Sequence, residues 1–189
     1  MKERMKEWLP IIGILVIVIV ARMFIFSPIK VEGHSMDPTL HTGERLISSK
    51  ISKIERADII TCKEPGDEKI YVIKRIIGLP GETVTMKNDK LFINKTNIKE
   101  DYLKDYRNKF KKDKLNDAYA FNKMFQEEAK HSDKFTNNFS VKVPKNKYFV
   151  LGDNRLVSKD SRIFGFVDKK MIQGKIVCRF FPITRFHIY

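Results

Sequence analysis

Cysteine is scarce in this chain, with Cys62 and Cys178 the only two among 189 residues. Two thiols are too few for a disulfide framework, and no CxxC pair or cysteine–histidine cluster has the spacing of a metal site. Each sits in an apolar setting, after Ile59-Ile60-Thr61 and after Ile176-Val177, which favours two small buried side chains. A disulfide between them outside the cell is the alternative that the sequence leaves open. The sequence implies no metal and no cofactor.

Acidic residues are in the minority, and nucleic-acid-binding motifs are missing. Lysine and arginine number 37 against 23 aspartate and glutamate residues, for a formal net charge of +14. The chain lacks an RNP-like aromatic box, zinc-finger spacing and a helix-turn-helix pattern, so no nucleic acid is expected as a partner. Membrane lipids with anionic head groups are the simpler partner for a basic domain held at a bilayer.

Only one long apolar run is present. Residues 8–26 are apolar except for Arg22, and a helix of this length reaches about 28 Å, close to the thickness of a bilayer core. Arg22 lies one turn from the outer end, where a long side chain can reach the head groups. A cleavable signal peptide is disfavoured, because residues 20–24 do not provide the small residues that such cleavage needs.

Basic residues before the apolar run favour a cytoplasmic N-terminus; they are Lys2, Arg4 and Lys6. We therefore expect a cytoplasmic N-terminus (residues 1–7), a transmembrane helix (residues 8–27) and an extracytoplasmic catalytic domain (residues 28–189). This division predicts a single-pass protein of the cell membrane.

The domain is predicted to be mostly β, because short apolar and β-branched runs alternate with turn residues. The expected strands are residues 29–31, 44–49, 57–61, 70–77, 83–86, 90–93, 141–143, 148–151 and 175–181, with a loop at 64–68. Asn88 and Asp89 predict a hairpin turn. Residues 97–140 are rich in lysine, asparagine and aspartate and predict an inserted lobe, with a helix over 118–130.

Three segments carry polar residues in patterns suited to a reacting centre. They read GHSMDPTL (residues 33–40), YVIKRIIGLPG (residues 71–81) and GDNRLVSKDSR (residues 152–162). The third is the densest polar turn and follows an apolar strand. Such a turn builds a poor core but fixes hydroxyls and carboxylates well.

In this order, behind an apolar anchor, the three segments resemble the conserved boxes of the bacterial type I signal peptidases, most closely the short Gram-positive kind. The resemblance implies a β fold related to that of repressor-type proteases. It also implies a membrane-bound serine endopeptidase that removes signal peptides from exported preproteins through an acyl-enzyme. The expected substrates have small residues at positions −1 and −3 before the cleavage site.

Ser35 and Lys74 match the nucleophile and the general base of this family. A serine hydroxyl needs an adjacent base to attack an amide, and a lysine acts as a base only when desolvation lowers its pKa. Strand alternation places Lys74 beside Val72 and Ile76 and turns Arg75 to the opposite face. The pattern therefore predicts apolar surroundings for the lysine.

Histidine is the other candidate base. His41 lies within possible reach of Ser35, and Asp153 or Asp160 could orient it in a Ser-His-Asp triad. His34 adjoins Ser35 and would point to the opposite side of an extended segment. Nothing else in the sequence supports a triad, so the Ser-Lys pair is preferred.

Supporting roles follow from the resemblance. Ser158 matches a serine that hydrogen-bonds the base lysine, Asp160 and Arg162 match a pair that holds the site together, and Asp153 and Asn154 are expected to shape the turn. The Ser35 N–H is the expected oxyanion donor, with Gly33 at the position where some relatives add a serine hydroxyl. The substrate-binding walls would be Ile29, Val31, Met36, Leu40 and Ile73.

Two rival functions remain at this stage. A self-cleaving repressor-type protease would need a DNA-binding domain, which residues 1–28 cannot supply, and an internal Ala-Gly or Cys-Gly bond, which the sequence lacks. A non-enzymatic binding protein tethered to the membrane would have no use for an intact Ser35 and Lys74.

Overall fold

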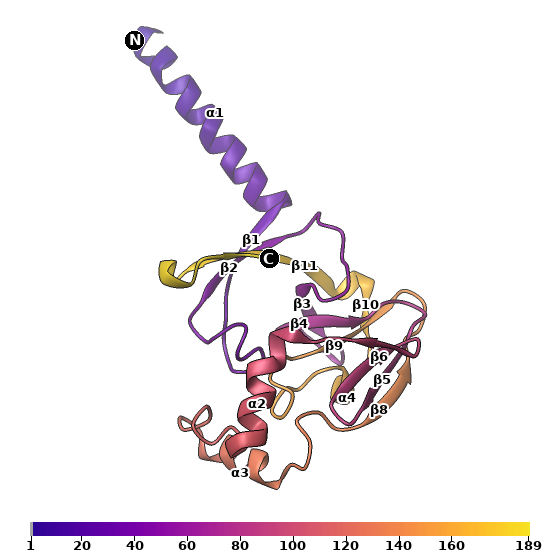
Figure 1. Cartoon of the computed structure of the whole chain (residues 1–189). Coiled ribbons are helices and arrows are strands. Elements are labelled where there is room, and N and C mark those ends of the chain that lie inside the picture. Colours follow the sequence, from indigo (N-terminus) through magenta and orange to yellow (C-terminus); the bar gives the residue numbers. More distant parts are fainter. Residues whose placement is uncertain (1) are drawn as a thin grey trace.

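Two antiparallel β-sheets form the framework of the chain beyond residue 25 (Figure 1). The computed structural model describes residues 2–189 and the side chains of residues 8, 10–20 and 24–189. The larger sheet has eight strands in the order β1-β2-β11-β3-β4-β9-β10, with β12 paired to β11. They are β1 (Phe26–Lys30), β2 (Arg45–Ser49), β3 (Ile59–Glu64), β4 (Asp67–Gly78), β9 (Lys147–Leu151), β10 (Val167–Asp168), β11 (Ile172–Phe181) and β12 (His187–Ile188). The predicted mostly β fold is confirmed.

The smaller sheet has four strands in the order β7-β6-β5-β8. They are β5 (Thr83–Lys87), β6 (Lys90–Ile93), β7 (Thr96–Ile98) and β8 (Phe139–Lys142). The predicted hairpin joins β5 to β6, where Asn88 and Asp89 have φ values of 50° and 58°, as a two-residue type I′ turn requires. A cluster that includes Val84, Met86 and Phe149 fills the space between the two sheets.

All nine predicted strands are present; the one over residues 90–93 has the predicted ends, and the other eight have shifted ends. The loop predicted over residues 64–68 is too long, because β4 already begins at Asp67, which pairs with Glu64. The sequence did not predict β7, β10 and β12, since strands of two or three residues are too short to show a period. Short helical turns at α4 (Ser161–Phe164), η2 (Lys169–Met171) and η3 (Ile183–Arg185) complete the domain.

Residues 99–138, between β7 and β8, form a helical lobe with η1 (Asp101–Leu103), α2 (Lys104–Asp113) and α3 (Lys123–His131). The predicted helix starts too early, because Asn122 is the N-cap of α3. Its side chain accepts hydrogen bonds from the backbone N–H groups of Met124 and Phe125. The sequence pattern did not predict α2, whose residues are mostly charged. Its buried side chains, Tyr106 and Phe110, recur at the four-residue spacing of one helix face.

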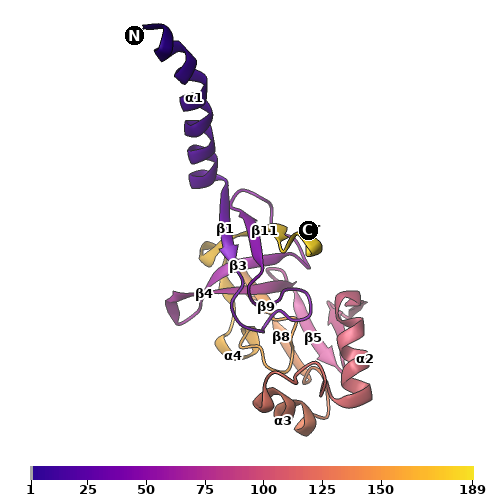
Figure 2. The ribbon, with the colours of Figure 1, turned by 90° about the vertical axis from the view of Figure 1, so that its left-hand side faces the viewer.

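The helix α1 (Lys2–Phe24) extends away from the sheets, at the end opposite the helical lobe (Figures 1 and 2). Within the part of the chain that the structure describes, no helix combines the length and the apolarity of a membrane crossing. The helix α1 ends at Phe24 and β1 begins at Phe26, shortly before the predicted boundary at residue 27. Pro28 favours extended backbone before it and suits this edge strand. The side chains of residues 1–7 and Arg22 lie outside those described.

Candidate active site

Ser35 and Lys74 lie side by side although they come from different parts of the fold. Ser35 belongs to the loop between β1 and β2, and Lys74 lies within β4. The Lys74 Nζ is 2.8 Å from the Ser35 Oγ, at hydrogen-bonding distance. A neutral amine at this distance can accept the hydroxyl proton, which is the first requirement for activating a serine.

Lys74 has the apolar surroundings that strand alternation predicted. Its side chain is only 3 % exposed. It pairs with Ile60 on β3, and the apolar cluster on this face includes Ile60, Ile76 and Val72. The guanidinium of Arg75, the next residue along the strand, instead donates hydrogen bonds to Asp153. The positive charge of Arg75 is therefore paired with the Asp153 carboxylate.

Burial lowers the pKa of the Lys74 ammonium below its ordinary value of 10.5. Nearby groups that favour the charged form oppose this shift; they are Asp160, Cys62, Glu64 and Asp153. Desolvation is the larger effect, so a neutral Lys74 forms at lower pH than a lysine in water would allow.

The two histidines near Ser35 both bind the carboxylate of Asp37 and not the serine. The Nδ1 atoms of His34 and His41 lie 3.0 Å and 2.7 Å from the two Asp37 oxygens. Asp37 is almost fully buried, which explains why it takes two partners. The alternative triad through His41 is therefore wrong for this structure.

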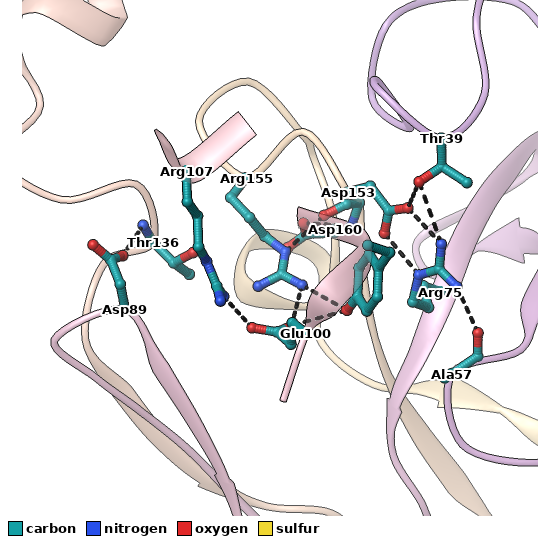
Figure 3. A network of polar contacts seen from close by, with 12 residues as sticks. Thr39, Ala57, Arg75, Asp89, Glu100, Arg107, Thr136, Asp153, Arg155 and Asp160 are labelled. Atoms are coloured by element: carbon teal, nitrogen blue, oxygen red, sulfur yellow. Dashed lines mark hydrogen bonds and ion pairs between the residues drawn. The ribbon is translucent and has the colours of Figure 1, made fainter. Parts of the chain in front are cut away.

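Asp153, one of the carboxylates considered for that triad, is fully engaged with Arg75. The guanidinium donates two hydrogen bonds of 2.8 Å and 2.6 Å to the Asp153 oxygens, and the Thr39 hydroxyl donates to the same carboxylate (Figure 3). Asp153 therefore joins the polar turn (residues 152–162) to β4 and to the loop that carries Ser35.

Asp160 and Arg162 form the pair that the resemblance implied. Arg162 Nε and Nη2 donate to the two oxygens of Asp160 at 2.8 Å and 2.7 Å. Asp160 also accepts the Gly152 N–H at 3.0 Å and caps α4 through the Arg162 N–H. This carboxylate thus closes the polar turn on itself, next to Lys74.

Asn154 holds the backbone of the segment that carries Ser35. Its N–H donates to the Ser35 carbonyl at 3.0 Å, and its side-chain Nδ2 donates to the His34 carbonyl at 3.0 Å. Two carbonyls of one segment are therefore held by one residue, which restricts where the Ser35 side chain can lie.

Ser158 does not bind Lys74, which corrects the expectation from the resemblance. Its Oγ is buried and has no hydrogen-bond partner among the described residues. The Ser158 N–H donates to the Asn154 carbonyl at 3.0 Å, and the hydroxyl lies against Gly152. A Cβ added at Gly152 would be 2.0 Å from that Oγ and 2.4 Å from the Ser35 carbonyl oxygen. Ser158 therefore contacts the site through packing with Gly152.

A cavity of about 500 Å³ opens beside the serine and the lysine. Four of the five predicted substrate-binding residues line it, together with Gly33, Ser35 and Lys74; they are Ile29, Val31, Met36 and Ile73. Leu40, the fifth, is fully buried in the apolar cluster beneath the loop and does not reach the cavity. Gly33 has a φ of 84°, in the left-handed region that favours glycine.

Sequence reasoning missed the polar residues that line the same cavity; they include Ser48, Thr61, Tyr71 and Gln173. They come from β2, β3, β4 and β11. Tyr71 had a sequence signal, because strand alternation puts it on the same face as Ile73. Thr61 lies opposite Ile73 only through the β3–β4 register of the folded chain. Ser48 and Gln173 have no such local signal.

Both cysteines are free thiols. Cys62 is buried on the same face of the sheet as Lys74, and burial raises the pKa of its thiol to about 12. The interpretation of Cys62 as a small buried hydrophobic residue is confirmed, whereas Cys178 is only partly buried.

A serine hydroxyl beside a buried amine, on the wall of a cavity, has the chemical equipment of a serine hydrolase. Residues 5–181 match the family described as signal peptidase, peptidase S26. The chain is 43 % identical over 197 residues to the signal peptidase I of Streptococcus pneumoniae, covering 97 % of this chain and 96 % of that protein. It is 42 % identical over 191 residues to the signal peptidase I of Bacillus licheniformis, covering 97 % and 92 %.

A crystal structure of a signal peptidase I from Enterococcus faecalis is also similar. It matches with a TM-score of 0.50 and 36 % identity, and the match covers 66 % of this chain and 97 % of that chain. The chain therefore belongs to the signal peptidase family, peptidase S26, and is an enzyme of the signal peptidase I type.

Proposed function

We propose that this enzyme removes N-terminal signal peptides from exported preproteins, with Ser35 as the nucleophile and Lys74 as the general base. The observation that carries the dyad is the 2.8 Å separation of Nζ and Oγ on the wall of a cavity, with the lysine buried. The printed names of the relatives, each a signal peptidase, support the substrate class.

The reaction proceeds through an ester on Ser35. The Oγ attacks the scissile carbonyl carbon while Lys74 takes the hydroxyl proton, and the C–N bond breaks as Lys74 returns that proton to the leaving amine. The signal peptide remains bound to Oγ as an ester. Lys74 then takes a proton from water, which hydrolyses the ester, and the proton returns to Ser35.

The backbone around the nucleophile stabilises the negative charge that develops on the carbonyl oxygen. The Ser35 N–H is the donor we assign, and Gly33 allows the substrate to approach the backbone closely. Asp153, Asn154 and the Asp160–Arg162 pair keep this backbone in place through the hydrogen bonds described above.

The cavity binds the small side chains that precede the cleavage site. Its apolar walls, formed by Ile29, Val31, Met36 and Ile73, favour small apolar side chains at positions −1 and −3 and exclude large ones by steric conflict. Leu40 supports the cavity from beneath.

The helix α1 anchors the enzyme in the cell membrane, with residues 1–7 in the cytoplasm and the β domain outside. The support is the apolar sequence of residues 8–26 and the exposure of its described side chains, for example 63 % at Ile14 and 68 % at Ile17. A continuous exposed apolar surface marks an interaction with a membrane or a partner. The formal net charge of +14 suits anionic lipids.

Cleavage of a preprotein in detergent, with N-terminal sequencing of the product, tests the proposed function. We expect Ser35→Ala and Lys74→Ala each to abolish cleavage while the protein still folds. The double variant should be no slower than either single variant, because the two residues act as one unit. The control is His41→Ala, which should keep most activity. A Lys74→Ala enzyme with near-normal turnover would rule out the dyad.

A further inference from the structure

The helical lobe (residues 99–138) reaches the nucleophile segment through the hydroxyl of Tyr119. Tyr119 is fully buried, and its hydroxyl donates a hydrogen bond to Asn154 Oδ1. The same Asn154 holds the Ser35 carbonyl through its N–H and the His34 carbonyl through its Nδ2. One amide side chain therefore connects the lobe to the backbone of the serine.

A second contact from the lobe reaches His34, the residue immediately before Ser35. The ring of Phe121 lies 4.3 Å from the His34 ring, centroid to centroid, and the Phe125 ring approaches the same imidazole at 6.1 Å. Phe121 is 55 % exposed, and it is not part of the buried cluster of the lobe. Its ring makes edge contacts with Tyr119 and Phe125 of the lobe, at 6.5 Å and 5.9 Å, and links these two residues to His34.

A third contact reaches Arg75, the residue immediately after Lys74. The guanidinium of Arg75 lies 4.0 Å from the centroid of the Tyr102 ring, a cation–π distance. The Tyr102 hydroxyl donates to Glu100 at 2.9 Å. The Glu100 carboxylate also binds the buried Arg155 of the polar turn (Figure 3). The lobe is thereby linked to the lysine strand as well as to the turn.

We propose that the helical lobe is a positioning element for the dyad, with Tyr119 and Phe121 as positioning residues for Ser35. The contacts reach a neighbour of each member of the dyad, so the lobe holds the serine loop and the lysine strand at a constant separation. This inference rests on the proposed function. The reaction rate depends steeply on the distance between the two reacting groups, since a displacement of about 1 Å can lower the rate roughly 100-fold.

The hydroxyl of Tyr119 can be removed without changing the packing of its ring. We expect Tyr119→Phe to lower kcat for preprotein cleavage by about tenfold, with KM changed less than twofold, because the substrate cavity contains no residue of the lobe. The matched control is Tyr106→Phe, at another buried tyrosine of the lobe, for which the described residues show no hydrogen bond to the hydroxyl. This control should keep kcat within twofold of the unchanged enzyme.

Phe121 provides an independent pair of variants. We expect Phe121→Ala to lower kcat by about threefold to tenfold with little change in thermal stability, because its ring is largely exposed. The matched control is Met124→Ala, at an apolar side chain of the same lobe that is 67 % exposed. It should leave kcat unchanged.

Hydrogen–deuterium exchange of the full chain tests the positioning role of the lobe independently of preprotein cleavage. In Tyr119→Phe, the amide of Asn154 and the amides of residues 33–40 should exchange about tenfold faster than in the unchanged enzyme and in Tyr106→Phe. Equal exchange in all three, or an equal fall of kcat in Tyr119→Phe and its control, would overturn the positioning role. Failure of the unchanged enzyme to cleave any preprotein would instead contradict the proposed function and leave the exchange result standing.

Discussion

Three carboxylates near Lys74 favour its ammonium form, and each of them already binds another cation. Glu64 binds Lys159. Asp160 accepts two hydrogen bonds from Arg162, and Asp153 accepts two from Arg75. Each guanidinium offsets part of the negative charge that would otherwise hold the lysine in its ammonium form. Burial can then dominate and lower the pKa of Lys74. A lowered pKa favours the neutral amine, which is the form that a lysine base requires.

The pH dependence of the reaction follows from this lowered pKa. As pH rises through the pKa of Lys74, the neutral amine becomes the major form, so kcat/KM should rise and level off below the ordinary value of 10.5. Lys74→Arg should be inactive at every pH, because a guanidinium stays charged. The measurement is a pH profile of preprotein cleavage for both enzymes. Substantial activity with arginine at this position would contradict the role of base.

At the scale of single elements, the polar turn after β9 works because Gly152 has no side chain. The Ser158 hydroxyl and the Ser35 carbonyl approach its Cα so closely that any Cβ would collide with them. The turn and the serine loop therefore pack directly against each other, and the Asn154 hydrogen bonds depend on this approach.

Gly152→Ala should separate these two segments. We expect a loss of about 1–3 kcal/mol in the free energy of unfolding, as for overpacking of a close contact, and a fall of roughly 100-fold in kcat as Ser35 moves away from Lys74. Urea unfolding and preprotein cleavage measure the two effects. Gly13→Ala is the control, because no atom lies within 4 Å of a Cβ added there. Wild-type activity in Gly152→Ala would show that the contact does not position the serine.

At the scale of the whole molecule, α1 and β1 are adjacent in sequence but differ in what they contribute. The strand β1 pairs with β2 over five residues and provides Ile29 to the cavity. The helix α1 ends just before it, at Phe24, and contributes no residue to the cavity. Removing α1 while keeping β1 therefore tests the proposed anchoring separately from the chemistry.

Two truncations test this separation. Removal of residues 2–24 should preserve cleavage of a short soluble peptide but slow cleavage of a preprotein in liposomes, because the local concentration at the bilayer is lost. Removal of residues 2–30 should impair both reactions, because the cavity loses a wall. The measurement is the cleavage rate of each truncated enzyme on the soluble peptide and on the liposomal preprotein. If the shorter truncation cleaves liposomal preprotein at the full-chain rate, the anchoring role of α1 is wrong.

Local patterns account for what could be predicted of the fold. Period-two alternation around Lys74 and the turn residues Asn88 and Asp89 act over a few positions, so the strands and the hairpin were correct to within a few residues. The helix α2 was missed because tertiary burial of Tyr106 and Phe110, and not its charged sequence, stabilises it.

The sequence by itself determined the β class of the domain, the three polar segments and the apolar face of Lys74, since each is a signal carried by neighbouring residues. Only the tertiary structure decided that both histidines bind Asp37, that Ser158 packs against Gly152 and that Leu40 lies beneath the cavity. Hydrogen-bond partners and burial depend on which distant segments pack together. Ser35 and Lys74 are 39 residues apart in the chain, and their contact exists only because the loop and the strand pack together in the fold.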